Sequence, residues 1–115
     1  MREFFERTLT RTRWSWHGIR DSWVNEHSFR YWVYANVMSG VLAIWLLEGA
    51  EVALILALGV LVLAAEAFNT AMERAVDLVT QEHHELAGRA KDAASGAVML
   101  TAIAVGVAWI AVLIF

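Results

Sequence analysis

The stretch VALILALGVLVLAAEAFNTAMERAVD, residues 52–77, changes character part-way along its length. Its first 14 residues carry no charge, and Glu66, Asn69, Glu73 and Asp77 then follow in quick succession. At about 100° per residue, these four side chains fall within about 80° of one another on a helix. The stretch therefore predicts one long helix that starts apolar on all sides and ends with a single polar face.

Acidic side chains on a membrane helix need an explanation. They are costly at that depth unless they are paired, bind a metal or face a wet cavity. Glu66 is the deepest and is a candidate for an acid–base role. Glu73 and Asp77 lie nearer the polar end and suit Mg²⁺, which prefers oxygen ligands. The same residues, Asn69 above all, can instead join helices, so spacing alone leaves chemistry and helix association open.

The composition indicates a membrane protein. The chain has 115 residues, which predicts one domain spanning residues 1–115. It is 59% hydrophobic, more than a soluble domain of this size can bury. The absence of cysteine excludes disulfides and thiolate metal sites, and the absence of proline suits long helices. The charged N-terminus does not resemble a signal peptide.

Three apolar segments are candidate membrane spans: residues 31–47, 52–77 and 93–115. A transmembrane helix needs about 20 residues. The third segment qualifies, the first is short, and the second reaches this length only by including Glu66 and Asn69. We predict an all-α integral membrane protein with three transmembrane helices. A soluble helical bundle is the alternative, but the third segment is apolar on every face.

The distribution of basic residues predicts the orientation. Six of the nine basic residues precede the first span, and the other three lie in or near the link at residues 78–92. The charged residues of the link between the first two spans, Glu48 and Glu51, are both acidic. The positive-inside rule then places the N-terminus and the link at 78–92 in the cytoplasm, with the C-terminus outside.

Residues 1–30 mix arginine with aromatic side chains, a combination that favours the lipid headgroup region. Leu9, Trp16, Ile19 and Trp23 follow helical spacing and form one stripe. We predict an amphipathic helix on the cytoplasmic membrane surface. The alternative is a solvated helix packed on the protein itself.

The link carries a cluster of polar side chains that includes Glu82, His83, His84, Lys91 and Asp92. Adjacent histidines on a helix point about 100° apart and cannot bind one ion together. The HExxH zinc pattern is absent. Lys91 can meet a phosphate as a point charge. A solvated polar loop without function is the alternative.

Three segments together resemble one known family. EAFNTAMERAVD (66–77), EHHELAGRAKDAASGAV (82–98) and SWHGIRDSWVNEHSFR (15–30) are similar to the small prokaryotic diacylglycerol kinases, integral-membrane lipid kinases. The resemblance implies a homotrimer in the bacterial inner membrane, each chain with a surface helix and three spans. It implies transfer of the ATP γ-phosphate to a lipid hydroxyl, in a site between subunits at the membrane surface.

The resemblance also implies roles for individual residues. Glu66 matches the general base, and Glu26 and Glu73 match the carboxylates that hold Mg²⁺, with ATP as co-substrate. The implied ATP-binding positions are Arg7, Trp14, Asn69, Glu73, Asp77, Glu82, His83, His84, Lys91 and Asp92. The implied lipid-binding positions are Trp16, Arg20, Trp23, Ser28, Phe29, Arg30, Glu66 and Ser95. No nucleic-acid partner is expected.

The sequence departs from the family pattern in two places. Trp14 stands where the family often has tyrosine, and Tyr31 and Trp32 stand where some members have Gln-Glu, which bears on the lipid contacts. No Walker A motif or protein-kinase glycine loop is present, so metal and side chains must hold the phosphates.

Three functions remain open. The segments SWHGIRDSWVNE and HELAGRAKD favour a diacylglycerol kinase that makes phosphatidic acid. The run from NTA to GAV is also similar to the undecaprenol kinase branch. A non-catalytic membrane scaffold or an ion-conducting oligomer is a third reading.

Overall fold

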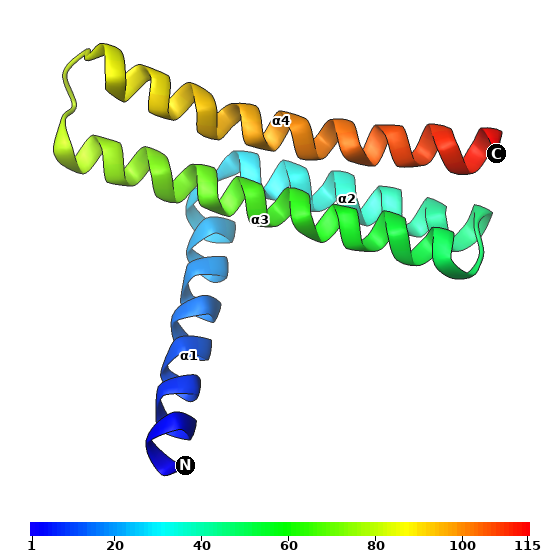
Figure 1. The fold of residues 1–115 in the computed structure, drawn as a ribbon, viewed down its shortest axis with the longest axis horizontal. Coiled ribbons are helices and arrows are strands. Elements are labelled where there is room, and N and C mark those ends of the chain that lie inside the picture. Colours follow the sequence, from blue (N-terminus) through cyan, green and yellow to red (C-terminus); the bar gives the residue numbers. More distant parts are fainter.

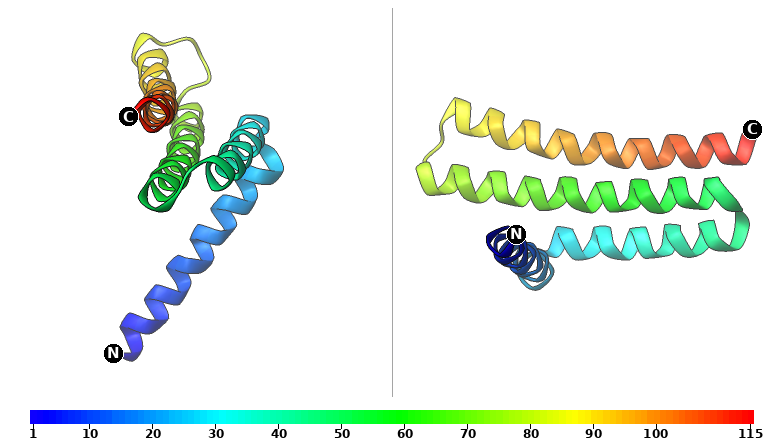
Figure 2. Two further views of the ribbon diagram at one scale, coloured as in Figure 1. Left: turned by 90° about the vertical axis from the view of Figure 1, so that its right-hand side faces the viewer. Right: turned by 60° about the horizontal axis from the view of Figure 1, so that its bottom comes forward.

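A computed structural model describes all residues from 1 to 115, and helices are its only regular elements (Figure 1). The helices are α1 (Arg2–Asn25), α2 (His27–Leu46), α3 (Gly49–Val79) and α4 (Glu85–Ile114). Helices α2, α3 and α4 run side by side, whereas α1 leaves them crosswise (Figure 2). The prediction of an all-α chain is confirmed.

Helix α3 lies in the middle of the bundle. It packs against both α2 and α4, while the Cα atoms of α2 and α4 nowhere approach within 8 Å. One side chain spans that gap, because the Trp109 indole Nε1 of α4 donates to the Ser39 hydroxyl of α2 at 2.8 Å. A small buried cluster lies at this end of the bundle. Its members are Ala43, Leu47, Ile55 and Ala108.

Close packing between α2 and α3 depends on Gly59. A Cβ atom at this position would lie 2.7 Å from Asn36 Oδ1, so the missing side chain makes room for that amide. The other end of the amide is satisfied within α2, where Asn36 Nδ2 donates to the Trp32 carbonyl at 2.8 Å. The α2–α3 contact therefore combines a small residue with a polar one, as is common between membrane helices.

A single residue separates α1 from α2. Glu26 has extended backbone angles, φ −115° and ψ 111°. The surface helix that the sequence predicts over residues 1–30 therefore ends at Asn25, and residues 27–30 form the first turn of α2.

The connection between α3 and α4 is shorter than the link expected over residues 78–92. Between α3 and α4, only residues 80–84 lie outside helices. His84 begins α4, because its Nδ1 accepts a hydrogen bond from the Leu86 backbone N–H at 3.1 Å and so satisfies one free donor of the first turn. The connection and the start of α2 face one end of the bundle, with the C-terminus at the other (Figure 1).

The chain exposes more surface than a soluble protein of its size. Its accessible surface is 8851 Å², whereas a folded soluble protein of this mass exposes about 6,300 Å². Helices α3 and α4 are long and apolar enough to cross a membrane, and only 22% and 11% of their apolar windows are buried. These two helices point to a membrane protein; a third span in α2 stays a prediction.

Candidate active site

A cavity of about 410 Å³ lies between α2, α3 and α4, and the polar face of α3 forms one wall. The lining residues are Ser28, Trp32, Glu66, Asn69, Glu73, Ser95, Val98, Met99 and Ala102. Three of the four residues predicted to share one face, Glu66, Asn69 and Glu73, thus line the cavity together. The fourth, Asp77, does not line it and pairs with Lys91 of α4 instead. The same cavity also contains both serines that the sequence placed in the lipid-binding region.

Glu66 is the buried carboxylate of the cavity, with 4% of its surface exposed. The Ser28 hydroxyl of α2 donates a hydrogen bond to Glu66 Oε1. A buried carboxylate is costly without such a donor. The contact pairs the first turn of α2 with the middle of α3, and it sets an alcohol O–H against a carboxylate oxygen.

Asn69 and Glu73 lie one turn apart on the same wall. Asn69 Nδ2 donates to Glu73 Oε1 at 3.3 Å. Asn69 Oδ1 is buried and has no hydrogen-bond partner. A buried acceptor left without a partner is costly, so this oxygen suits a ligand that brings a donor or a positive charge.

The donor set around Glu73 fits Mg²⁺. The chain contains no group of three or more acidic or histidine side chains close enough to hold a metal by themselves. Mg²⁺ does not require one, because it usually binds one or two carboxylates together with waters and substrate phosphates. The Glu73 carboxylate and the free Asn69 oxygen supply hard oxygen ligands of this kind.

Glu26 does not line the cavity. Its Oε1 accepts from Arg74 Nη2 at 2.9 Å, and the other arm of the same guanidinium bonds to Asp21. Hydrogen bonds from Arg74 and then from the Asn25 amide hold the pKa of the Asp21 carboxyl below its ordinary value. Of the two predicted metal carboxylates, the single chain thus brings only Glu73 to the cavity.

A family model described as prokaryotic diacylglycerol kinase matches residues 13–113. The chain belongs to this family. The match covers most of the chain, including all the residues that line the cavity.

Individual relatives agree with the family assignment. A diacylglycerol kinase of Escherichia coli strain K12 is 37% identical over 106 residues, covering 91% of this chain and 87% of the relative. One from Haemophilus influenzae is 34% identical over 108 residues, covering 93% and 92%. An undecaprenol kinase of Bacillus subtilis is 58% identical, but over only 38 residues, or 33% of this chain and 31% of the relative.

The predicted nucleotide-binding residues of this diacylglycerol kinase family member fall into separate groups. Lys91 Nζ of α4 contacts Asp77 Oδ1 of α3 at 2.5 Å, which ties the two helices together beyond the cavity. Glu82 and His83 lie exposed in the connection between these helices, and Asp92 is exposed on α4.

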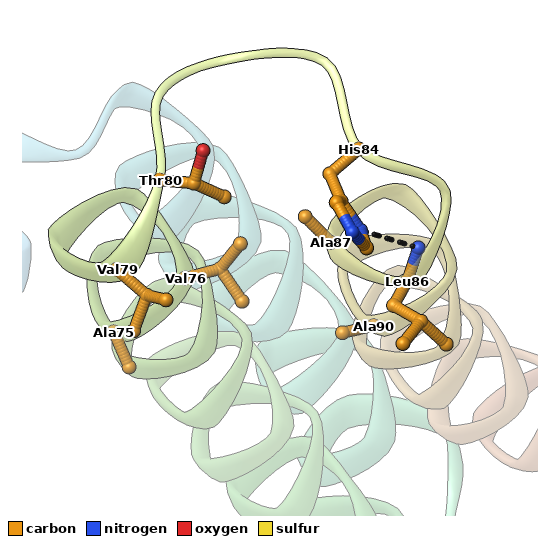
Figure 3. Close-up of a pocket in the computed structure, with 8 residues that line it drawn as sticks. All are labelled: Ala75, Val76, Val79, Thr80, His84, Leu86, Ala87 and Ala90. Atoms are coloured by element: carbon orange, nitrogen blue, oxygen red, sulfur yellow. Dashed lines mark hydrogen bonds between the residues drawn. The ribbon is translucent and has the colours of Figure 1, made fainter.

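His84 lines a second cavity, of about 490 Å³, between the end of α3 and the start of α4 (Figure 3). Its walls are mostly apolar and share no residue with the carboxylate cavity. The residues drawn around it are Ala75, Val76, Val79, Thr80, His84, Leu86, Ala87 and Ala90. The histidine ring is held there by the Leu86 backbone N–H.

The predicted residues of α1 are not brought to the cavity within a single chain. Residues 1–20 are all exposed along the part of α1 that projects from the bundle (Figure 1). Arg7 pairs with Glu3 one turn away at 2.6 Å, while Trp14, Trp16 and Arg20 are exposed on the same helix.

Three predicted lipid-binding residues lie around the α1–α2 break. Phe29 is buried inside the chain. Trp23 packs edge to face on Tyr34, with ring centroids 5.9 Å apart. The Arg30 guanidinium donates to the Trp23 and Val24 carbonyls at 2.7 and 3.0 Å, so it satisfies two carbonyls at the end of α1.

Sequence reasoning counted Arg74 among the basic residues that set the orientation but gave it no role in the site, although its side chain joins α3 to Asp21 and Glu26. One signal for it was present. Arg74 follows Glu73, so its side chain points about 100° away around the helix. It therefore faces any segment that packs beside the polar face of α3. Trp32, which the sequence singled out only as a departure from the family pattern, also lines the cavity, and the apolar residues of α4 that line it were not predicted.

Proposed function

We propose that the protein is an ATP-dependent diacylglycerol kinase that forms phosphatidic acid. One observation carries the proposal: Glu66 is buried against an alcohol O–H, in a cavity that also presents Glu73. Family membership supports the same activity, as do two relatives that match over most of the chain and are diacylglycerol kinases.

The acceptor hydroxyl reacts at Glu66. The lipid hydroxyl takes the position on the carboxylate that Ser28 now occupies, and its proton passes to Glu66 as its oxygen attacks the γ-phosphorus. A new O–P bond forms, the bond from the γ-phosphorus to the β,γ-bridging oxygen breaks, and ADP leaves. Positioning and charge stabilisation dominate such a transfer, while the base contributes by removing the acceptor proton.

The polar end of α3 holds the phosphates. Glu73 would hold Mg²⁺ with the free Asn69 oxygen beside it. Glu26, which Arg74 holds outside the cavity, would supply the second carboxylate. When bound, the ion would neutralise charge on the phosphate oxygens. Lys91 adds a positive charge for the phosphates. Asp77 orients the Lys91 ammonium group, because the two side chains form an ion pair.

The remaining predicted residues form two groups, and apart from Ser28 and Ser95, which line the cavity, they extend the site beyond it. The exposed nucleotide-binding group comprises Arg7, Trp14, Glu82, His83, His84 and Asp92. The lipid-binding group comprises Trp16, Arg20, Trp23, Ser28, Phe29, Arg30 and Ser95.

The assembly we propose is a homotrimer in the bacterial inner membrane. Each chain is one membrane domain with α2, α3 and α4 as three spans, and α1 lies on the cytoplasmic surface with the N-terminus. The large exposed apolar surface supports this arrangement, because lipid or neighbouring subunits must cover it.

A lipid phosphorylation assay tests the proposed activity. The purified protein, in mixed micelles with diacylglycerol, Mg²⁺ and γ-labelled ATP, should transfer label to phosphatidic acid. If neither diacylglycerol nor undecaprenol becomes labelled at any Mg²⁺ concentration, the lipid kinase assignment is wrong.

Undecaprenol is the second candidate acceptor. The short match to the Bacillus subtilis undecaprenol kinase is the observation that favours it, since its identity exceeds that of the longer matches. The same micelle assay with undecaprenol in place of diacylglycerol decides between the lipids. We expect higher kcat/KM for diacylglycerol, and the opposite ranking would assign the chain to the undecaprenol branch.

A further inference from the structure

One guanidinium joins three parts of the chain beside the cavity. Arg74 of α3 bonds to Asp21 of α1 through Nη1 and to Glu26, the residue between α1 and α2, through Nη2 at 2.9 Å. These partners are 53 and 48 residues away in sequence. The planar guanidinium suits the task, because it presents several N–H donors in a fixed fork and can engage two carboxylates at once.

Helix α1 has few other attachments to the bundle. Residues 1–20 are exposed throughout, and within α1 only Ser22 is buried. Figure 2 shows α1 extending away from α2, α3 and α4, with its attachment at one end only. The direction of the whole helix therefore depends on its last turn, where Asp21 meets Arg74.

The start of α2, together with Glu26 just before it, is held on α3 at two points. Ser28 bonds to Glu66, and Glu26 bonds to Arg74 eight residues further along α3. Eight residues of helix span about 12 Å. Because Glu73 and Arg74 are neighbours about 100° apart, one faces the cavity while the other holds Glu26 at its side.

We propose that Arg74 is a positioning residue, which holds Glu26 and α1 in a fixed relation to the cavity on α3. The inference rests on the proposed function, because that function gives Glu26 its part in holding Mg²⁺–ATP. Without the guanidinium, Asp21 and Glu26 are left as two like charges with no common partner. Glu26 then loses its fixed place, and α1 is held at its end only by the Arg30 hydrogen bonds and the Trp23–Tyr34 contact, so its direction varies more.

The experiment measures geometry and kinetics on the same variants. The chain has no cysteine, so spin labels on Thr12→Cys and Gln81→Cys report the distance from α1 to the α3–α4 connection. Labelled chains are diluted with unlabelled ones in lipid nanodiscs, so that each distance lies within one chain. Arg74→Ala should broaden the distance distribution, raise KM for Mg²⁺–ATP roughly fivefold, and lower kcat by less than about twofold.

Three further variants separate the causes. Asp21→Ala keeps the Glu26 contact, so it should broaden the distances but leave KM within about twofold of wild type. Arg74→Lys keeps the charge without the fork and should fall between Arg74→Ala and wild type. Arg13→Ala, at an exposed arginine of α1 without an ion pair, should change neither quantity.

Several outcomes would overturn the inference. A wild-type distance distribution or a wild-type KM in Arg74→Ala overturns it, as does wild-type behaviour of Arg74→Lys. A KM in Asp21→Ala as high as in Arg74→Ala would assign the effect to α1 as a whole and not to Glu26. If the wild-type protein phosphorylates no lipid, the proposed function fails, yet the distance comparison still tests whether Arg74 anchors α1.

Discussion

The carboxylate of Glu66 is almost fully removed from water, and its near neighbour is the Ser28 hydroxyl. We expect Glu66→Gln to lower kcat by about 10²–10⁴-fold. The glutamine side chain keeps the shape of glutamate, but it cannot take the proton from the lipid hydroxyl. KM for ATP should change little. Steady-state lipid phosphorylation measures both. Ser28→Ala is the matched control, since it removes the donor and leaves the base, and its loss in kcat should be much smaller. Near-normal turnover in Glu66→Gln would exclude Glu66 as the base.

Glu73 differs from Glu66 because its side chain is only partly buried and its Oε1 accepts a hydrogen bond from the Asn69 amide. We expect Glu73→Gln to raise the Mg²⁺ concentration for half-maximal activity roughly tenfold, because a neutral amide is a weaker ligand for a hard cation. A Mg²⁺ titration at fixed ATP measures this. Glu51→Gln, at an exposed acid near the other end of α3, should leave the requirement unchanged. The same Mg²⁺ requirement in Glu73→Gln as in wild type would argue against a metal ligand.

Sequence reasoning succeeds at this scale where the geometry is local. The shared face of Glu66, Asn69 and Glu73 follows from helical spacing alone, and the structure confirms it. The contact of Glu66 with Ser28 crosses 38 residues and that of Arg74 with Asp21 crosses 53. The spacing of residues within one helix cannot predict such pairs, because they depend on how the helices pack.

At the scale of the helix, the α2–α3 contact depends on the missing side chain of Gly59. We expect Gly59→Ala to lower the free energy of unfolding by about 1–3 kcal/mol, because the added Cβ would overlap the Asn36 amide in a packed interface. Denaturant titration of the protein in micelles measures the change. Gly106→Ala is the control, since a Cβ there meets no atom within 4 Å. Equal stability of the two variants would contradict the close α2–α3 packing.

The helix boundaries show where element prediction stops. The apolar runs located α3 and α4, since each run is long and uninterrupted. The break at Glu26 was not predicted, because neither proline nor glycine stands near it. It is held instead by long side chains: Arg30 bonds to carbonyls of the last turn of α1, and Arg74 bonds to Glu26 itself. Such a break is fixed by tertiary contacts that local propensity does not contain.

At the scale of the whole molecule, the composition predicted that much apolar surface would stay exposed, and the fold leaves it so. A 115-residue chain that is 59% hydrophobic cannot bury its apolar surface by itself. The structure buries only 13 residues, so the apolar excess lies outside. What composition cannot give is the partner that covers each face, because lipid and a neighbouring subunit both cover apolar surface.

Mixing experiments address how the proposed trimer shares its sites. Glu66 and Glu73 line one cavity within one chain, so chains carrying Glu66→Gln cannot lend a base to neighbours carrying Glu73→Gln. We therefore expect no recovery of lipid phosphorylation when the two variants are unfolded, mixed in equal amounts and refolded together. Mixing either variant with wild-type chains is the control, and activity there should follow the wild-type fraction. Substantial recovery in the mixture of variants would mean that the base and the metal ligand come from different subunits, and that the cavity within one chain is half of a composite site.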